Sequence, residues 1–173
     1  TPALLDALRR PAASISLTAG SAFFGDLRLG AGAAIDVDAA ARVALTAGRQ
    51  LTVLGTVDAP AGRIDLTTNP GGGPDDAYLS SQSIWLGADA ALRAAGAVKL
   101  TPDAQGLRRG AVLDGGTVTL SAGKGYVITE AGSLIDVSGT HGVLDISVAD
   151  LAQAGADGRA ALATDIASAG GQM

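Results

Sequence analysis

Several residue types that carry chemistry are missing or rare in this sequence. There is no cysteine, which excludes disulfide bonds, thiolate zinc sites and thiol catalysis. His141 is the only histidine, so a metal cage built from several histidines is excluded as well. Neither a Gly-Lys-Ser/Thr phosphate loop nor a dinucleotide glycine fingerprint occurs. We therefore predict no catalytic residue, no cofactor and no metal site, and we do not expect an enzyme.

Aromatic residues, basic residues and long apolar runs are also scarce. Only 3% of the residues are aromatic although 47% are hydrophobic, which predicts a thin core of alanine, valine, leucine and isoleucine. The 12 basic residues against 17 acidic ones give a net charge of -5 and form no basic stripe, so nucleic acid is not expected as a partner. No apolar run approaches the ~18 residues of a membrane span. We therefore expect no membrane-spanning segment.

A short triplet, apolar-x-apolar followed by a small-residue break, recurs along most of the chain. It occurs at residues 15–17, 27–29, 35–37, 43–45, 51–53, 64–66, 84–86, 98–100, 118–120, 135–137 and 144–146. Because side chains alternate across a strand, each triplet directs two apolar groups to one face and one residue to the other. Strands this short cannot bury a face alone and must stack on copies of themselves. The pattern predicts an all-β solenoid.

The spacing of the triplets indicates three strands per turn. Residues 42–62 have the length of one turn of a three-sided coil, with an additional strand at 56–58, and Arg63 begins the next turn. We assign 1–13 to a short helix or linker and 14–147 to the repeats, with inserted loops at about 69–82 and 101–115. Residues 148–173 are expected to form an Ala/Gly-rich excursion that leads to a further repeat. Because the chain opens at Thr1 without a leader and ends within a repeat, we expect a segment of a longer protein.

Acidic residues are the first candidates for chemistry, since carboxylates on one strand face could form an acid-base or calcium site. The candidates are Asp36 with Asp38, Asp65, Asp136 and Asp145, most of them in the middle of a triplet. Their apolar neighbours should point inward, so we expect these acids to point outward to solvent. A calcium or acid-base site would require these acids to lie on the same side of successive turns, which the sequence does not determine.

Two aromatic residues, Trp85 and Tyr78, are candidates for carbohydrate contact. Trp85 is the middle residue of the triplet at 84–86 and either faces outward beside the loop that carries Tyr78 or seals the base of that loop. We favour the second arrangement. Tyr126 is distant in the sequence, and the three residues are scattered rather than arrayed.

Three stretches resemble the repeats of filamentous haemagglutinin-like exoproteins: 131–139 (AGSLIDVSG), 115–123 (GGTVTLSAG) and 26–32 (DLRLGAG). The resemblance implies a right-handed parallel β-helix, secretion through an outer-membrane partner by the two-partner pathway, and a location outside the bacterial cell. Members of the family serve as adhesins or as stalks that present toxins. Their secretion domain carries Asn-Pro-Asn motifs, whereas here Asn69-Pro70 is followed by Gly71. The chain therefore resembles an internal stalk segment.

The sequence thus leads to one expected function and two alternatives. We expect a structural stalk segment of a large secreted or surface-exposed bacterial protein that supports cell adhesion or displays a distal domain, with a cell-surface receptor or glycan as possible partner. The first alternative is a β-helix module that binds carbohydrate or acts on polysaccharide. The second is a unit that self-associates through its ends.

Overall fold

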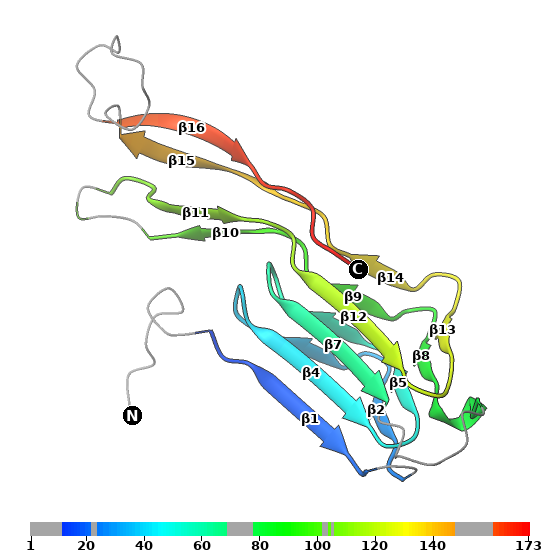
Figure 1. Ribbon diagram of the computed structural model, residues 1–173. Helices are drawn as coiled ribbons and strands as arrows, with labels where there is room; N and C mark the ends of the chain where they lie inside the picture. The colour runs from blue at the N-terminus through cyan, green and yellow to red at the C-terminus, as the bar shows by residue number, and fades with distance from the viewer. Residues whose placement is uncertain (1–11, 22–23, 69–77, 102–103, 105, 148–160) are drawn as a thin grey trace, which may run out of the picture.

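The computed structural model describes residues 12–21, 24–68, 78–101, 104, 106–147 and 161–173 (Figure 1). This part of the chain is all-β, with sixteen strands and a single 3-10 turn, η1 (Ser80–Gln82). Twelve of the strands form three parallel sheets, and the other four form two antiparallel hairpins. The helix or linker expected at 1–13 lies almost entirely outside the described residues, as does most of the first inserted loop.

The three parallel sheets have four strands each. Sheet A contains β1 (Ile15–Ala19), β4 (Arg42–Ala47), β7 (Arg63–Thr68) and β12 (Thr117–Ala122). Sheet B contains β2 (Leu27–Leu29), β5 (Leu51–Val53), β8 (Ile84–Leu86) and β13 (Val127–Thr129). Sheet C contains β3 (Ala34–Asp36), β6 (Thr56–Asp58), β9 (Ala91–Arg93) and β14 (Leu134–Asp136).

The chain passes through sheets A, B and C in the same order four times. We call each passage a layer: β1 to β3, β4 to β6, β7 to β9, and β12 to β14. Arg42 is the Cα partner of Arg63, which confirms that residues 42–62 make one repeat, and the additional strand expected at 56–58 is β6. The triplet pattern did not predict β9, because its sequence Ala-Leu-Arg ends in a charged residue where the triplet requires a second apolar one.

Equivalent residues of successive layers stack into apolar columns inside the three sheets. One column in sheet A consists of Leu17, Leu45, Leu66 and Leu120. Leu45 and Leu66, in the two central layers, are fully buried, whereas Leu17 in the first layer is 46% exposed. The buried core cluster contains aliphatic side chains only, as its composition predicted. Each layer thus depends on its neighbours for burial.

Two of the triplets lie outside the parallel sheets, although we expected both to be strands of the repeats at 14–147. Residues 98–100 belong to β10 (Ala97–Leu100), which pairs antiparallel with β11 (Gly110–Leu113), so the segment at 101–115 is partly strand. Residues 144–146 belong to β15 (His141–Ser147), which pairs antiparallel with β16 (Ala161–Ala167) in the segment assigned to an excursion. Period-2 alternation is the same in both kinds of strand, so it does not distinguish them.

Both hairpins leave from the corner between sheet C and sheet A. At the corresponding corner between the second and third layers the chain makes a tight turn, in which Gly62 N donates to Ala59 O at 2.9 Å. Gly116 N makes the equivalent bond to Ala94 O at 2.6 Å across the base of the first hairpin. Gly171 N does so to Val137 O at 2.7 Å across the base of the second. The hairpins are insertions into one turn, and they lie side by side in Figure 1.

Glycines at this corner allow successive layers to approach closely. A Cβ atom on Gly116 would overlap the carbonyl oxygen of Gly62, and one on Gly171 would overlap that of Gly116. The same carbonyls accept hydrogen bonds from Thr117 N at 2.9 Å and from Gln172 N at 3.0 Å. Thr117 and Gln172 also form an isolated parallel bridge, so residues 171 and 172 continue the ladder of sheet A beyond β12.

Candidate functional site

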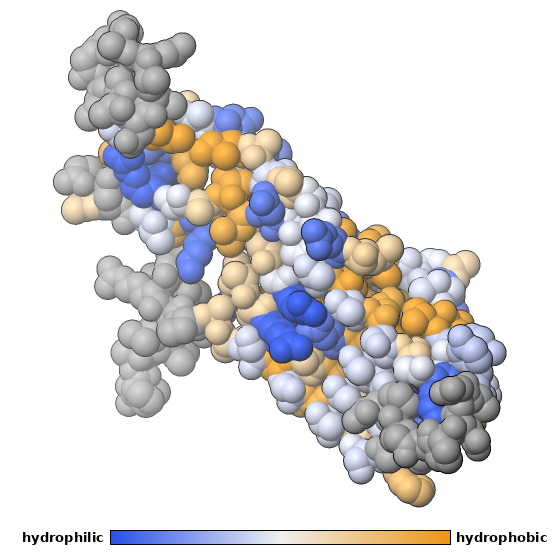
Figure 2. All heavy atoms as spheres, viewed as in Figure 1, coloured by the Kyte–Doolittle hydropathy of each residue, from blue (hydrophilic) through white to orange (hydrophobic). Residues whose placement is uncertain are grey.

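The outer face of sheet A carries one compact ionic cluster, formed by Arg42, Arg63 and Asp65. Arg42 Nε donates to Asp65 Oδ2 at 2.7 Å, and Arg63 Nε donates to Oδ1 at 2.8 Å and to Oδ2 at 2.9 Å. Asp65 points away from the core as expected, but it is only 7% exposed because the two arginines cover it. The expectation of a solvated carboxylate is therefore wrong for Asp65. The cluster is the hydrophilic area over β4 and β7 in Figure 2.

Two opposing effects act on the pKa of Asp65. Burial raises it, but the hydrogen bonds from Arg63 and Arg42 outweigh burial and leave the pKa below its ordinary value. A carboxylate whose pKa is lowered in the folded state stabilises the fold above its unfolded pKa, and this contribution is lost as the pH falls through the folded pKa.

Replacement of Asp65 by asparagine should therefore lower the free energy of unfolding by about 1 kcal/mol at neutral pH, a modest value because both arginines are solvent-exposed. Urea unfolding of wild type and Asp65→Asn should show this difference shrinking below pH ~4. Asp89→Asn, at an exposed turn, is the control and should show almost no difference at either pH. A difference for Asp65→Asn that is the same at neutral and acidic pH would contradict the assignment.

The outer face of sheet C carries a row of charged residues, one from each layer. Asp36, Asp58, Arg93 and Asp136 are successive Cα partners from β3 to β14. Burial and then the charge of Asp36 raise the pKa of Asp58, with Arg93 acting in the opposite direction. A hydrogen bond from Ser138 N, at 2.9 Å, lowers the pKa of Asp136. Two of the predicted acids, Asp36 and Asp136, thus fall on one side but at opposite ends of the row.

This row does not have the form of a metal or acid-base site. Arg93 stands between Asp58 and Asp136, and neighbouring strands space the backbone by ~4.8 Å. Within the described residues, no group of three histidine, aspartate or glutamate side chains is arranged to hold a metal ion. Open space lies beside Asp36, Val37 and Asp38 at the first layer, in a hollow of about 370 Å³ that Ala13 and Ile15 also line.

Two other candidates lie on the hairpins. Asp145, on β15, accepts hydrogen bonds from Arg108 N at 2.7 Å and from Arg108 Nη2 at 3.0 Å, so it joins the second hairpin to the first. These bonds lower its pKa. His141 begins β15 and lies 3.5 Å from Asp165 Oδ1 through Nδ1, with both side chains largely exposed. β15 pairs with β16 and not with a strand of sheet C, so neither Asp145 nor His141 belongs to the row of charged residues on that sheet.

The outer face of sheet B holds Trp85, which points outward from the middle of β8. Its Nε1 donates to Glu130 Oε1 at 3.0 Å, and the other oxygen of Glu130 accepts from Ala88 N at 2.9 Å. Trp85 is the Cα partner of Thr52 on one side and Ile128 on the other. The indole is therefore held by a carboxylate of the fourth layer, a contact that the triplet pattern does not predict.

Tyr78 stacks on Tyr126, with ring centroids 5.5 Å apart and an interplanar angle of 14°. Tyr78 is 71% exposed and Tyr126 is 52% exposed. The prediction that these aromatics are scattered is therefore wrong for this pair. Tyr126 N donates to Ser83 Oγ at 3.1 Å, which sets Tyr126 beside the residue two positions before Trp85. The sequence carries no signal for this stacking, because the pairing of Ile128 with Trp85 that brings Tyr126 to this surface is seen only in the structure.

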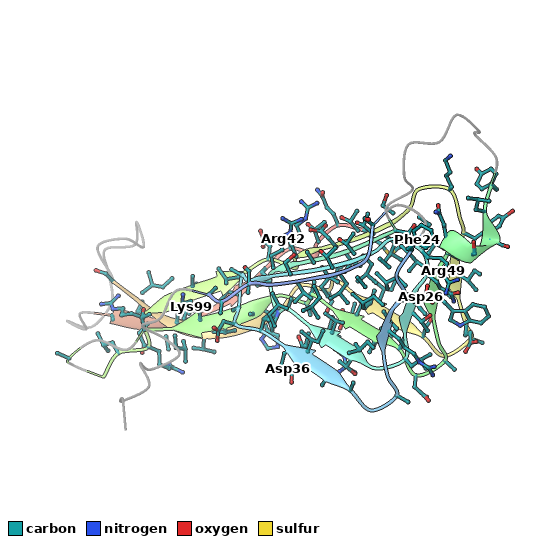
Figure 3. All side chains as sticks on the ribbon, turned by 90° about the horizontal axis from the view of Figure 1, so that it is seen from below. Phe24, Asp26, Asp36, Arg42, Arg49 and Lys99 are labelled. Carbon is teal, nitrogen blue, oxygen red and sulfur yellow. The ribbon has the colours of Figure 1, made fainter. Side chains whose placement is uncertain are left out.

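The candidate residues are thus distributed over three faces and two hairpins. Figure 3 shows Arg42 and Asp36 on opposite sides of the ribbon, whereas Arg49 and Asp26, joined by an Nε to Oδ1 hydrogen bond of 2.7 Å, lie together near Phe24. Asp65 belongs to sheet A, Asp36 and Asp136 to sheet C, and Trp85 to sheet B. The acids and the aromatics do not share one groove.

Two further findings bear on function. The described residues include no helix long and apolar enough to cross a membrane. Comparison of the chain with protein-family models, with curated proteins and with solved structures found no match.

Proposed function

We propose that this chain is a segment of right-handed parallel β-helix that serves as a structural stalk in a large secreted or surface-exposed bacterial protein of the filamentous haemagglutinin-like adhesin type. The observation that carries the proposal is the repeated passage through sheets A, B and C with equivalent residues in register. Right-handedness is supported by the strong general preference of crossovers between parallel strands. The dispersed acids support a mechanical role over a catalytic one.

The two end layers support a stalk that extends in both directions. In the fourth layer, Val127 is 44% exposed although its column partners Ile84 and Leu51 are fully buried. An open hollow of about 660 Å³ lies over β12, β13 and Ile135, beside Gln172 and Met173. Sheet edges and apolar columns that end without a partner are stabilised when a further layer is added. The same edges are the surfaces through which self-association would occur.

The proposal is tested with an antibody against this chain on intact cells of the organism that produces the protein. We expect labelling without permeabilisation and its loss after external protease treatment; signal that appears only after permeabilisation would contradict a surface location. A variant of the full-length protein that lacks residues 42–62, one whole repeat, should still be displayed, because β1 can then pair with β7 in the register that it has with β4. Loss of display or of folding in this variant would argue against interchangeable layers.

A further inference from the structure

Three of the five aromatic residues lie together on one surface, and none of the aromatic residues that the structure describes belongs to the buried core cluster. The sequence has one tryptophan, two tyrosines and two phenylalanines. Trp85, Tyr78 and Tyr126 lie on the outer face of sheet B and the adjoining turn, and the core cluster is aliphatic. Rings that do not contribute to the core and remain exposed are available for binding, since exposed aromatic surface otherwise has an energetic cost.

The geometry points to a binding surface for a neutral oligosaccharide, formed by Tyr78, Tyr126 and Trp85, which we call the aromatic strip. Tyr126 precedes Ile128 by two residues on the same face, and Ile128 is the Cα partner of Trp85. With ~4.8 Å between strands and ~6.6 Å between alternate residues, the backbones of Tyr126 and Trp85 are roughly 8 Å apart. The strip therefore offers ring surfaces at neighbouring positions, and the C–H faces of pyranose rings pack well on such surfaces.

Polar groups beside the strip match the hydroxyl groups of a sugar. Glu130 is fixed by Trp85 Nε1 and Ala88 N, and a carboxylate that is held in place can accept further hydrogen bonds. Thr52, the neighbour of Trp85 in β5, accepts from Gln50 Nε2 at 3.3 Å, so a hydroxyl and an amide lie on the other side of the indole. A few polar groups around apolar rings are typical of saccharide recognition.

The charge next to the indole selects among glycans. Glu130 is hydrogen-bonded directly to Trp85, so an acidic sugar stacked on the indole would be repelled by a carboxylate in contact with the same ring. Neutral sugars do not meet this repulsion. The inference does not rest on the stalk function, because the strip is a property of the sheet B surface alone.

Trp85 is the only tryptophan, so its fluorescence reports on this surface alone. The protein is titrated with the neutral hexasaccharides cellohexaose and maltohexaose and with an acidic oligogalacturonate. We expect a saturable change with at least one neutral saccharide and a weaker response to the acidic one. Tyr126→Ala and Tyr78→Ala should each raise the Kd at least about tenfold, whereas Tyr126→Phe, which keeps the ring, should stay within about twofold.

Thr67→Ala, on the outer face of sheet A, is the matched control and should bind as wild type does. The midpoint of thermal unfolding is measured for every variant, and the exposed tyrosines should be replaceable without loss of folding. The inference fails if no neutral saccharide changes Trp85 fluorescence at millimolar concentration, if both alanine variants still bind, or if the acidic saccharide binds more tightly. It also fails if the strip instead joins two copies, which light scattering would detect as a mass that rises with concentration.

Discussion

Replacement of Leu66 by alanine is expected to lower the free energy of unfolding by about 3 kcal/mol, within the ~2–5 kcal/mol found for fully buried leucines. Leu66 is completely buried in the third layer, and its neighbours in the column are Leu45 and Leu120. The alanine leaves a cavity that the layers on either side cannot fill, because their backbones are fixed by the sheet A ladder. Urea denaturation followed by circular dichroism measures the loss.

The column supplies its own control. Leu17 has the same side chain and the same inward direction, but it belongs to the first layer and is 46% exposed. Leu17→Ala should cost about 1 kcal/mol or less, since much of its apolar surface is already in contact with water. Equal losses for Leu17→Ala and Leu66→Ala would show that burial does not depend on neighbouring layers and would remove the main support for the layered core.

The second large effect is expected for Gly116→Ala, at the corner before β12. The new Cβ would overlap the carbonyl oxygen of Gly62, which accepts the hydrogen bond of Thr117 N at 2.9 Å. Relief of the overlap requires the two layers to separate at this corner, with loss of that bond and of packing beyond it. We expect a loss of about 3 kcal/mol or more, visible as a large drop in the midpoint of thermal unfolding.

Gly30 provides the matched comparison, because a Cβ on Gly30 would meet no atom within 4 Å. Gly30→Ala should change the free energy of unfolding by less than about 1 kcal/mol, and it could even stabilise the fold by restricting the unfolded chain. If Gly116→Ala were as mild as Gly30→Ala, close stacking of glycines would not be what sets the layer spacing at this corner.

The repeat could be predicted because local pattern and tertiary pairing agree in most of the chain. In residues 35–37, for example, Ile35 and Val37 pack against the core while Asp36 is exposed, as alternation requires. The antiparallel hairpins could not be predicted in the same way. Residues 98–100 alternate like the rest, but their partner is the next strand of a hairpin, β11, and not an equivalent strand of another layer.

The surface contacts were harder to foresee than the core. Asp65 was expected to be solvated, but arginines from two adjacent strands cover it, and this depends on the register between Arg42 and Arg63. The stacking of Tyr78 on Tyr126 joins a residue before η1 to one before β13, across segments that carry no periodic signal. Trp85 was expected to close the base of a loop; it points outward and bonds to Glu130 in the next layer.

The shared turn from which both hairpins emerge separates two ways in which this chain can vary in size. Its closing hydrogen bond is the same whether the turn holds two residues between Ala59 and Gly62 or a whole hairpin between Ala94 and Gly116. Addition of a repeat adds one strand to each parallel sheet, whereas addition of a hairpin at this corner adds width along one edge, where Arg108 and Asp145 connect successive hairpins. The number of layers and the width of the molecule can therefore change independently. Foreign sequence inserted at this turn should project from one edge and leave the pairing of the parallel strands unchanged.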